Sequence, residues 1–516
     1  MNILLYRKIF PCAQAPNKER PFIPWLKPRG FPGRGSVTTQ PLFARSRAKI
    51  QGASQGITLL LDNEKKKNTI TVLDGIRGLA CFLVMFYHLN LVARDYHIWI
   101  PIHDLGSLAG SIALFGQSGV ILFFMLSGFL LFLPYAKSML LEKDWPSVRL
   151  FYLRRAFRIM PGYYIALFLL TPLMHPEYLQ KTHLEDLWLF ITFRMDFPQT
   201  FQRINGPFWT LAIEVQFYIL LPLLAWAMSP IVCRGSMRRR VTWLTICVCG
   251  VIAWGFFSRY WGLHWGALYP RTPTFPFLLP PSFAAAIKPY IFGTDGKYFE
   301  DFGIGMLICV AYVYSQNTPP DAPWNKRMHR ISPILFLAGI VVLSWMALWH
   351  FYTWYYNHTL HFMDQYRDFF IRGWGEWQAI YFGIGYGLFM FALLYGPKWL
   401  VRPWEWAPLR WTGLLSYSLY IWHLPLMTIF VQSSLPHLQA GGMPRLIQYG
   451  VFCLWTLLVI VPFSLALYLL IEKPGMHLGG ILCRKLLKHE KGHRIIPAET
   501  VAFDRPLENA IASQRD

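Results

Sequence analysis

The chain has 516 residues, of which 54% are hydrophobic and only 15% are charged, with a net charge of +22. Soluble globular proteins carry about a quarter charged residues, so this composition excludes an ordinary soluble domain. The eight cysteines have neither the spacing of a disulfide framework nor that of a metal site.

Residues 1–68 are rich in Pro, Gly and Arg and contain no apolar run long enough for a signal peptide. We predict that they form a disordered, basic cytoplasmic extension. A membrane domain is predicted over residues 69–475, and a basic cytoplasmic tail over residues 476–516.

The membrane domain contains ten apolar runs, most of them long enough to cross a bilayer as a helix. They lie at about 74–93, 112–134, 150–173, 207–230, 241–258, 299–316, 331–351, 376–396, 411–432 and 447–471. The runs are continuous rather than alternating, which excludes an outer-membrane barrel. The predicted fold class is therefore all-α, a polytopic integral membrane protein with about ten transmembrane helices.

The basic residues indicate how these spans are oriented. If the spans alternate, 38 of the 49 Lys and Arg residues fall on the side of the N-terminus. Positive charge marks the cytoplasmic side, so we predict that both termini are cytoplasmic, in a bacterial-type inner (plasma) membrane. The positive charge is therefore explained mostly by the orientation of the spans in the membrane. The predicted partner is the lipid bilayer and not nucleic acid.

The first run, LDGIRGLACFLVMFYHLN at residues 73–90, carries three ionisable side chains, Asp74, Arg77 and His88. Arg77 and His88 are eleven residues apart, about three helical turns, so they share a face and His88 lies about 16 Å further along the axis. If Arg77 marks one membrane surface, His88 lies near the middle of the hydrocarbon core, where an ionisable group points to a function. The alternative is a neutral histidine that is hydrogen-bonded to a neighbouring helix.

The third run begins with an arginine cluster in FYLRRAFRIMPGYY, residues 151–164. Arg155 and Arg158 share a helical face, and Arg154 stands beside them. Guanidinium groups suit bidentate binding of phosphate, so these arginines are candidate phosphate ligands. The alternative is that they only orient the span, because Arg is common at cytoplasmic helix ends.

The segment GPFWTLAIEVQFYILLPLL, residues 206–224, places Glu214 inside a span, with Trp209 nearby. A buried carboxylate must be paired, protonated or strongly hydrogen-bonded. Glu214 is therefore interpreted either as a structural salt-bridge partner or as a catalytic group.

A second histidine lies in LSYSLYIWHLPL, residues 415–426, where Tyr420 and His423 fall on one helical stripe. His423 lies at a depth comparable to that of His88. The two histidines either share one site or lie in separate polar pockets. The last run ends at Glu472, and Pro474 is predicted to stop its helix.

Together these segments resemble the acyltransferase type 3 family, membrane acyltransferases that O-acylate surface polysaccharides and some antibiotics. The resemblance runs from about residue 70 to about residue 475. It rests on LDGIRGLA followed by His88, FFMLSGFLL, LRRAFRIMP, FWTLAIEVQFYILLPLL, SYSLYIWH and the terminal IEKP. Each segment alone is weak evidence, but six in the family's order are specific.

The resemblance implies transfer of an acyl group, acetyl or another short acyl, from cytoplasmic acyl-CoA to a hydroxyl of a carbohydrate or glycolipid acceptor. Arg77 and His88 match the family's arginine followed eleven residues later by histidine, and Arg155 and Arg158 match its paired arginines. Acyl-CoA is implied as a substrate, with no tightly bound cofactor and no metal.

This implied chemistry suits the predicted layout, because a hydroxyl needs a base that works near neutral pH. We hypothesise direct transfer with His88 as general base, and an acyl-histidine intermediate is the variant. Arg77 would orient a phosphate or hold a counter-charge, and Asp74 would fix the start of the helix. Four residues would either position the acceptor or have a structural role: Glu214, His423, Trp209 and Tyr420.

Two other functional classes fit some of these residues. A membrane transporter uses buried His, Glu and Arg as a proton or substrate site, but the motif order contains no inverted repeat. A scaffold that has lost its chemistry would not need the intact pair of Arg77 and His88.

Overall fold

The computed structural model describes residues 70–98, 115–265, 281–355 and 366–492, which all belong to one compact unit, Ile70–Arg505. Every regular element in these residues is helical, which confirms the predicted all-α class for the part described. The predicted extension, 1–68, and the end of the predicted tail, from 493, lie outside the described residues.

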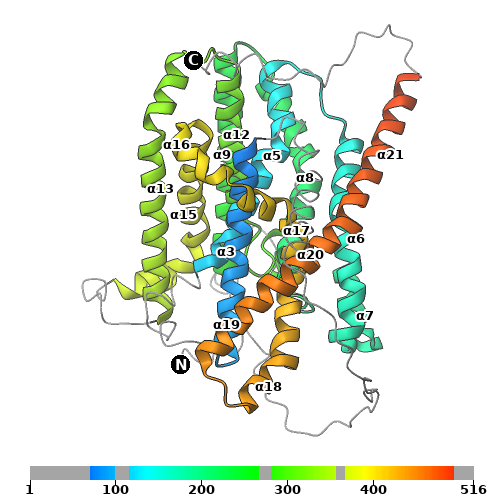
Figure 1. The fold of residues 1–516 in the computed structure, drawn as a ribbon. Coiled ribbons are helices and arrows are strands. Elements are labelled where there is room, and N and C mark those ends of the chain that lie inside the picture. Colours follow the sequence, from blue (N-terminus) through cyan, green and yellow to red (C-terminus); the bar gives the residue numbers. More distant parts are fainter. Residues whose placement is uncertain (1–69, 99–114, 266–280, 356–365, 493–516) are drawn as a thin grey trace, which may run out of the picture. The chain divides into compact units, whose positions relative to one another are not determined.

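Most of the described chain lies in long α-helices joined by short connections (Figure 1). The α-helices are α3 (Thr71–Asp95), α5 (Gly119–Leu141), α6 (Val148–Met174), α7 (Leu184–Ile191), α8 (Phe208–Val232), α9 (Met237–Leu263), α11 (Pro281–Ile291), α12 (Phe299–Gln316), α13 (Pro323–Tyr355), α15 (Arg367–Tyr395), α16 (Lys398–Val401), α17 (Ala407–Ile429), α18 (Leu435–Ala440), α19 (Arg445–Trp455), α20 (Val461–Leu467) and α21 (Lys473–Gly492). Short 3-10 turns are η2 (Gly116–Ser118), η3 (Pro176–Leu179), η4 (Lys181–His183) and η6 (Arg402–Glu405).

Nine helical runs in the described residues are long and apolar enough to cross a membrane, which supports the predicted polytopic membrane protein. They coincide with nine of the ten predicted runs. The remaining one, 299–316, forms α12, which is less apolar because Glu300 and Asp301 lie in its first turn. It packs between α5, α9 and α15 rather than at the periphery.

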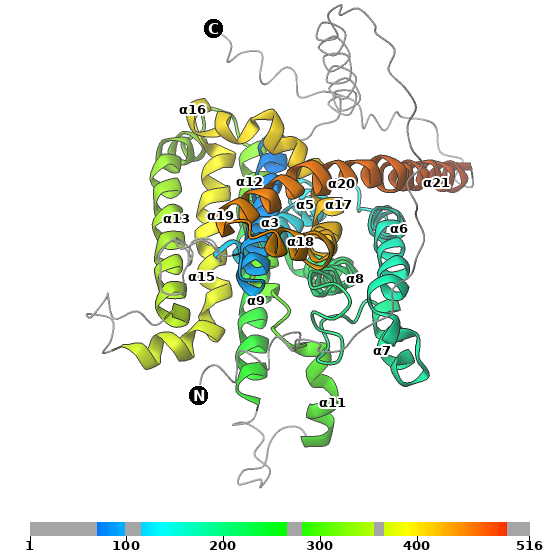
Figure 2. The same ribbon diagram turned by 60° about the horizontal axis from the view of Figure 1, so that its bottom comes forward.

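The packing of α3 against α17 brings two predicted site segments together (Figures 1 and 2). Glycines let the two backbones touch. A Cβ atom at Gly78 would lie 2.0 Å from the carbonyl oxygen of Leu409, and one at Gly413 would lie 2.0 Å from that of Asp74. Such small residues are how membrane helices approach most closely.

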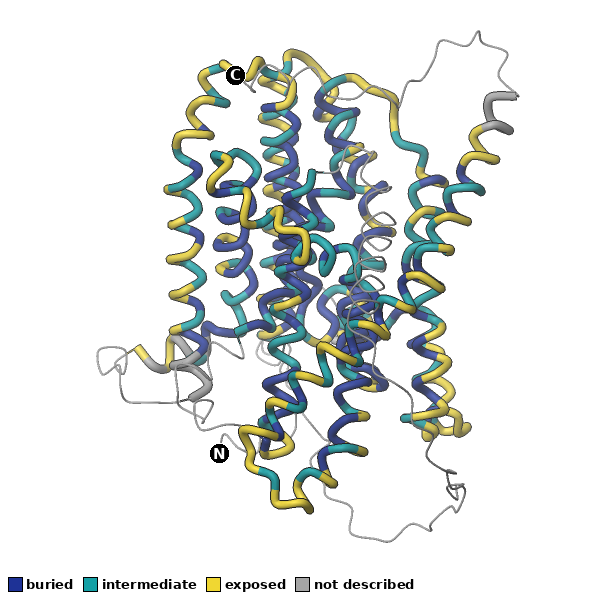
Figure 3. Tube along the Cα trace, in the orientation of Figure 1, coloured by how far each residue is buried: buried dark blue, intermediate teal, exposed yellow. Residues whose placement is uncertain are grey.

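Burial separates the inner helices from the outer ones (Figure 3). Buried side chains concentrate on α3, α5, α12 and α17, whereas α13 exposes large apolar residues such as Ile334 (68%), Leu337 (62%) and Val341 (60%). Apolar side chains on that outer face suit contact with lipid. Two of these inner helices, α3 and α17, carry His88 and His423.

Pro474 does not stop the last helix, contrary to the sequence prediction. The helix continues from η9 (Tyr468–Glu472) through α21 to Gly492. Three π-helical turns occur near the end of the chain, and each ends two residues before a proline: η7 (Phe430–Ser434) before Pro436, η8 (Thr456–Ile460) before Pro462, and η9 before Pro474. The wider turn accommodates the missing N–H and the ring, so each proline is tolerated inside a continuous helix.

Candidate active site

His88 and His423 are in direct contact, so the two histidines share one site. Nδ1 of His88 lies 3.1 Å from Nε2 of His423. The same Nδ1 atom lies 2.9 Å from the carbonyl oxygen of Val84, and Nδ1 of His423 lies 2.9 Å from that of Leu419. His423 is completely buried and His88 is half-buried.

The carbonyl contacts assign the tautomer of each ring. A carbonyl oxygen only accepts, so both Nδ1 atoms must carry a hydrogen. Nε2 of His423 then has a free lone pair. It accepts the single Nδ1–H of His88 in a bifurcated hydrogen bond that the carbonyl oxygen of Val84 shares. Nε2 of His88 has no hydrogen-bond partner among the described residues. The arrangement thus presents one basic nitrogen whose ring orientation is fixed on its other side.

Tyr420 lies on α17 one turn before His423, and Trp209 lies in the first turn of α8. The ring of Tyr420 is 6.0 Å from that of His423, and its hydroxyl is 2.7 Å from Oγ1 of Thr210 in the first turn of α8. Trp209 packs in the opposite direction, with ring centroids 5.6 Å from Phe201 and 5.7 Å from Tyr298. Tyr420 therefore belongs to the histidine site, and Trp209 belongs to the aromatic cluster next to it.

A hydrogen bond made possible by Pro425 attaches the segment just before α8 to α17. A proline has no N–H, so the carbonyl of Ile421, four residues earlier, loses its usual helical partner. The side chain of Asn205 donates to that carbonyl at 2.8 Å. This bond holds the chain just before α8 against α17, next to His423.

Arg77 lies on the same face of α3 as His88 but nearer the start of the helix. Its Nη1 atom is 3.3 Å from Oδ1 of Asp74, and both side chains are 16% exposed. Asp74 is not the N-cap of α3, because Ile70 occupies that position. Asp74 acts in the first turn instead, where a negative charge favours the helix.

The predicted arginine pair lies close to Arg77. Arg77 interacts electrostatically with Arg155, Arg158 and Glu214. Arg155 and Arg158 are half-buried and form no hydrogen bond or close ion pair within the described chain, and Nε of Arg155 is buried without a partner there. Arg154 is exposed. Two adjacent guanidinium groups without close carboxylate partners are well suited to bind an anion.

Two carboxylates complete this cluster. Oε1 of Glu214 accepts a hydrogen bond from Oγ of Ser127 at 2.6 Å. Oε2 of Glu472 accepts one from Oγ of Ser418 at 3.0 Å, and Glu472 interacts electrostatically with Arg158. From the sequence alone, Glu472 is predicted only to end a span. Its position opposite Ser418 depends on the π turn that it ends, which no periodicity in the sequence reveals.

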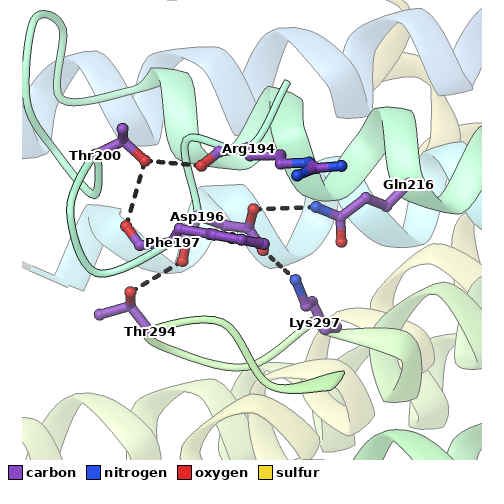
Figure 4. A network of polar contacts seen from close by, with 7 residues as sticks. All are labelled: Arg194, Asp196, Phe197, Thr200, Gln216, Thr294 and Lys297. Carbon is purple, nitrogen blue, oxygen red and sulfur yellow. Dashed lines mark hydrogen bonds and ion pairs between the residues drawn. The ribbon is translucent and has the colours of Figure 1, made fainter. Parts of the chain in front are cut away.

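A buried ion pair fixes two connections that lie outside the spans (Figure 4). The ammonium group of Lys297 contacts Oδ2 of Asp196, and both side chains are 2% exposed. Nε2 of Gln216 donates to Oδ1 of Asp196 at 3.0 Å, and Oγ1 of Thr294 donates to its backbone carbonyl at 2.9 Å. Burial lowers the pKa of Lys297, and the negative charge of Asp196 opposes that shift. These contacts clamp the chain before α12 to α8.

Replacing Lys297 with methionine is expected to cost about 3–5 kcal/mol of stability, because it leaves the Asp196 carboxylate buried without its cation. The measurement is the apparent melting temperature of the purified protein in detergent. The double variant Lys297→Met/Asp196→Leu serves as control and is expected to recover most of the loss, since replacing a whole buried pair is often nearly neutral. Equal losses in both variants would contradict a clamp based on charge.

Within the described residues, no group of three or more His, Cys, Asp or Glu side chains is placed to hold a metal ion. The site that the structure presents therefore consists of the histidine pair and, nearer the start of α3, the arginine cluster. Such an arrangement can take up a proton at the first and bind an anion at the second.

Comparison with known proteins gives a family and two relatives. Residues 70–467 match the family described as "Acyltransferase domain". The "Peptidoglycan O-acetyltransferase OatA" of Listeria monocytogenes serovar 1/2a (strain ATCC BAA-679 / EGD-e) is 25% identical over 383 residues, which are 69% of this chain and 49% of that protein. The "Putative peptidoglycan O-acetyltransferase YrhL" of Bacillus subtilis (strain 168) is 25% identical over 378 residues, 69% of this chain and 48% of that protein. The chain spans about half the length of these relatives, and no solved structure matches it significantly.

Proposed function

The chain belongs to the acyltransferase-domain family that matches residues 70–467, and we propose that it transfers a short acyl group, acetyl in the first instance, from acyl-CoA to a hydroxyl of a glycan. The names of the two relatives support acetyl as the group and a cell-wall polymer as the acceptor class. The observation that carries the proposal concerns Nε2 of His88, which has no hydrogen-bond partner in the described part of the chain, while contacts at Nδ1 hold the ring.

In the proposed reaction, His88 is the general base. Nε2 takes the proton of the acceptor hydroxyl while the oxygen attacks the carbonyl carbon of the thioester. The C–S bond breaks, and the proton passes from Nε2 to the leaving thiolate. The products are the O-acyl ester and the free thiol of CoA, and His88 returns to its neutral form.

Arg155 and Arg158 are proposed to hold the donor. If both termini are cytoplasmic, as the distribution of Lys and Arg predicts, Arg155 and Arg158 face the compartment that contains acyl-CoA. Their lack of close carboxylate partners in the described chain leaves them available for its phosphates. Arg77 interacts electrostatically with both arginines and shares a face of α3 with His88, so we assign it the role of orienting the donor. We further propose that the protein lies in a bacterial plasma membrane with both termini in the cytoplasm.

The acceptor is proposed to approach from the side of Trp209. The aromatic cluster of Trp209, Phe201 and Tyr298 provides flat apolar faces of the kind that stack on sugar rings. Tyr420 contacts the ring of His423 and bonds to Thr210, the residue after Trp209. Glu214 is already bonded to Ser127, which favours a role in holding the arginine cluster. Family membership disfavours the transporter alternative.

The first test is acetyl transfer by the purified, full-length protein, with acetyl-CoA as donor and soluble peptidoglycan fragments as acceptor. Mass spectrometry would detect the acetylated fragment, and a thiol reagent would detect released CoA. We expect both products to form together. A well-folded protein that yields neither product would contradict the proposed function.

Replacing both Arg155 and Arg158 with glutamine is expected to raise the KM for acetyl-CoA about 100-fold with little change in kcat, because charge-assisted bonds to phosphate are lost. Arg154→Gln is the matched control and should change KM by no more than about twofold, since Arg154 is exposed. S-acetylpantetheine, which lacks the nucleotide, should be used equally well by all variants. A similar loss with both donors would show that the pair does not bind the nucleotide phosphates.

A further inference from the structure

We propose that His423 is the positioning partner of His88: its Nε2 atom accepts the Nδ1–H of His88, keeps Nε2 of His88 basic, and stabilises the imidazolium that forms during transfer. This inference rests on the proposed function and adds a second residue to it. Three contacts carry it, the 3.1 Å contact between the rings and the 2.9 Å contact of each Nδ1 atom with a carbonyl oxygen.

The hydrogens of the pair have one consistent arrangement. If Nε2 of His423 carried the hydrogen, its Nδ1 lone pair would face the carbonyl oxygen of Leu419 at 2.9 Å, which is repulsive. The same argument applies to His88 and Val84. Each helix therefore fixes the tautomer of its own histidine through the carbonyl four residues earlier. His423 can only accept from His88, and His88 can only donate to His423.

The partner of His88 is a neutral imidazole rather than a carboxylate, and the burial of the site explains why. In the described chain, neither histidine forms a hydrogen bond or ion pair with a carboxylate. A carboxylate beside His88 would place an uncompensated charge deep in the membrane domain whenever His88 is neutral, which is costly. A fully buried neutral imidazole avoids that cost and still offers a lone pair when His88 becomes positively charged.

The neighbours of His423 keep the accepting nitrogen in place. Asn205 and Pro425 fix the local path of α17 through the carbonyl of Ile421. The close approach of α3 and α17 at Gly78 sets the separation of the two helices. Through the step described above, His423 gains and loses no proton. It holds the Nδ1–H of His88 while Nε2 accepts the hydroxyl proton and returns it to sulfur.

Two amide variants test this role with a matched pair. Glutamine at position 423 is long enough to place an accepting oxygen where Nε2 lies, whereas asparagine reaches only the region of Nδ1, near the carbonyl of Leu419. We expect His423→Asn to lower kcat by about 10- to 100-fold, as when the outer partner that orients a metal-bound histidine is lost. The KM for acetyl-CoA should remain within about twofold. His423→Gln should recover most of kcat.

A double-variant cycle separates this role from a structural one. If His423 acts only through His88, then adding His423→Asn to His88→Ala should cause no further loss of the residual rate. A structural role would lower the rate in both backgrounds. Gel-filtration profiles and melting temperatures check folding, and His423→Met, which offers no accepting oxygen or nitrogen, replaces the asparagine variant if that one does not fold.

The possible outcomes are distinct. Equal rates for the asparagine and glutamine variants, or losses that add to that of His88→Ala, would overturn the role of His423 while leaving the function intact. No transfer by the wild-type protein, or full transfer by His88→Ala, would contradict the proposed function itself. A low rate with asparagine, recovery with glutamine and no additivity would establish the positioning role.

Discussion

Replacing His88 with alanine is expected to lower the rate of acetyl transfer by at least about 1,000-fold, because the acceptor hydroxyl then has no base at the point of attack. Binding of acetyl-CoA should be nearly unchanged, since His88 lies about three helical turns from Arg77 and its neighbours. The measurement is kcat with acetyl-CoA and peptidoglycan fragments, together with equilibrium binding of CoA.

His97→Ala is the matched control for this variant. His97 lies just beyond the end of α3, is exposed, and contacts none of the site residues, so its replacement should leave kcat within about twofold, as for most surface changes. Transfer by His88→Ala at the wild-type rate would contradict the proposed role. Rapid mixing with acetyl-CoA alone separates the two mechanisms, because only an acyl-histidine intermediate would leave acetyl on the protein without an acceptor.

The contact between the two histidines shows what sequence patterns can predict and what they cannot. The spacing of Arg77 and His88 on one helix face is fixed by helical geometry, and so is the depth of His423. Neither pattern says which helix α3 packs against. That depends on backbone contact at Gly78 and Gly413, between segments that are more than 300 residues apart in the chain. The sequence therefore predicted both histidines and left their pairing open.

The end of the chain shows where a local rule gives a wrong prediction. A proline after an apolar run normally ends a helix, but η9 widens the helix just before Pro474. This turn also directs Glu472 towards Ser418. Similarly, Asp196 and Lys297 lie in connections without periodicity, so nothing in the pattern indicates that their side chains meet. These contacts are set by packing of distant segments, which overrides local preference.

Gly78→Ala is expected to disrupt the packing of α3 against α17. The new Cβ atom would lie 2.0 Å from the carbonyl oxygen of Leu409 and 3.0 Å from its carbonyl carbon, and backbone atoms of a packed helix do not yield easily. Overpacking of this kind costs about 1–3 kcal/mol and sometimes more. We expect a clearly lower melting temperature and, because α3 and α17 move apart, loss of most acetyl transfer.

Gly250→Ala makes this test specific, because it introduces the same methyl group into a helix where nothing lies within 4 Å of the new atom. Alanine is favoured over glycine in a helix by about 1 kcal/mol, so this variant should be as stable as the wild type or more so. The same preference acts at Gly78, and any loss there reflects the contact of α3 with α17 alone.

If Gly78→Ala folds with normal stability but has the rate of His423→Asn, the glycine serves chiefly to keep the two histidines within hydrogen-bonding distance. If it keeps both stability and rate, the two helices tolerate a wider separation, and the pairing of the rings does not control transfer.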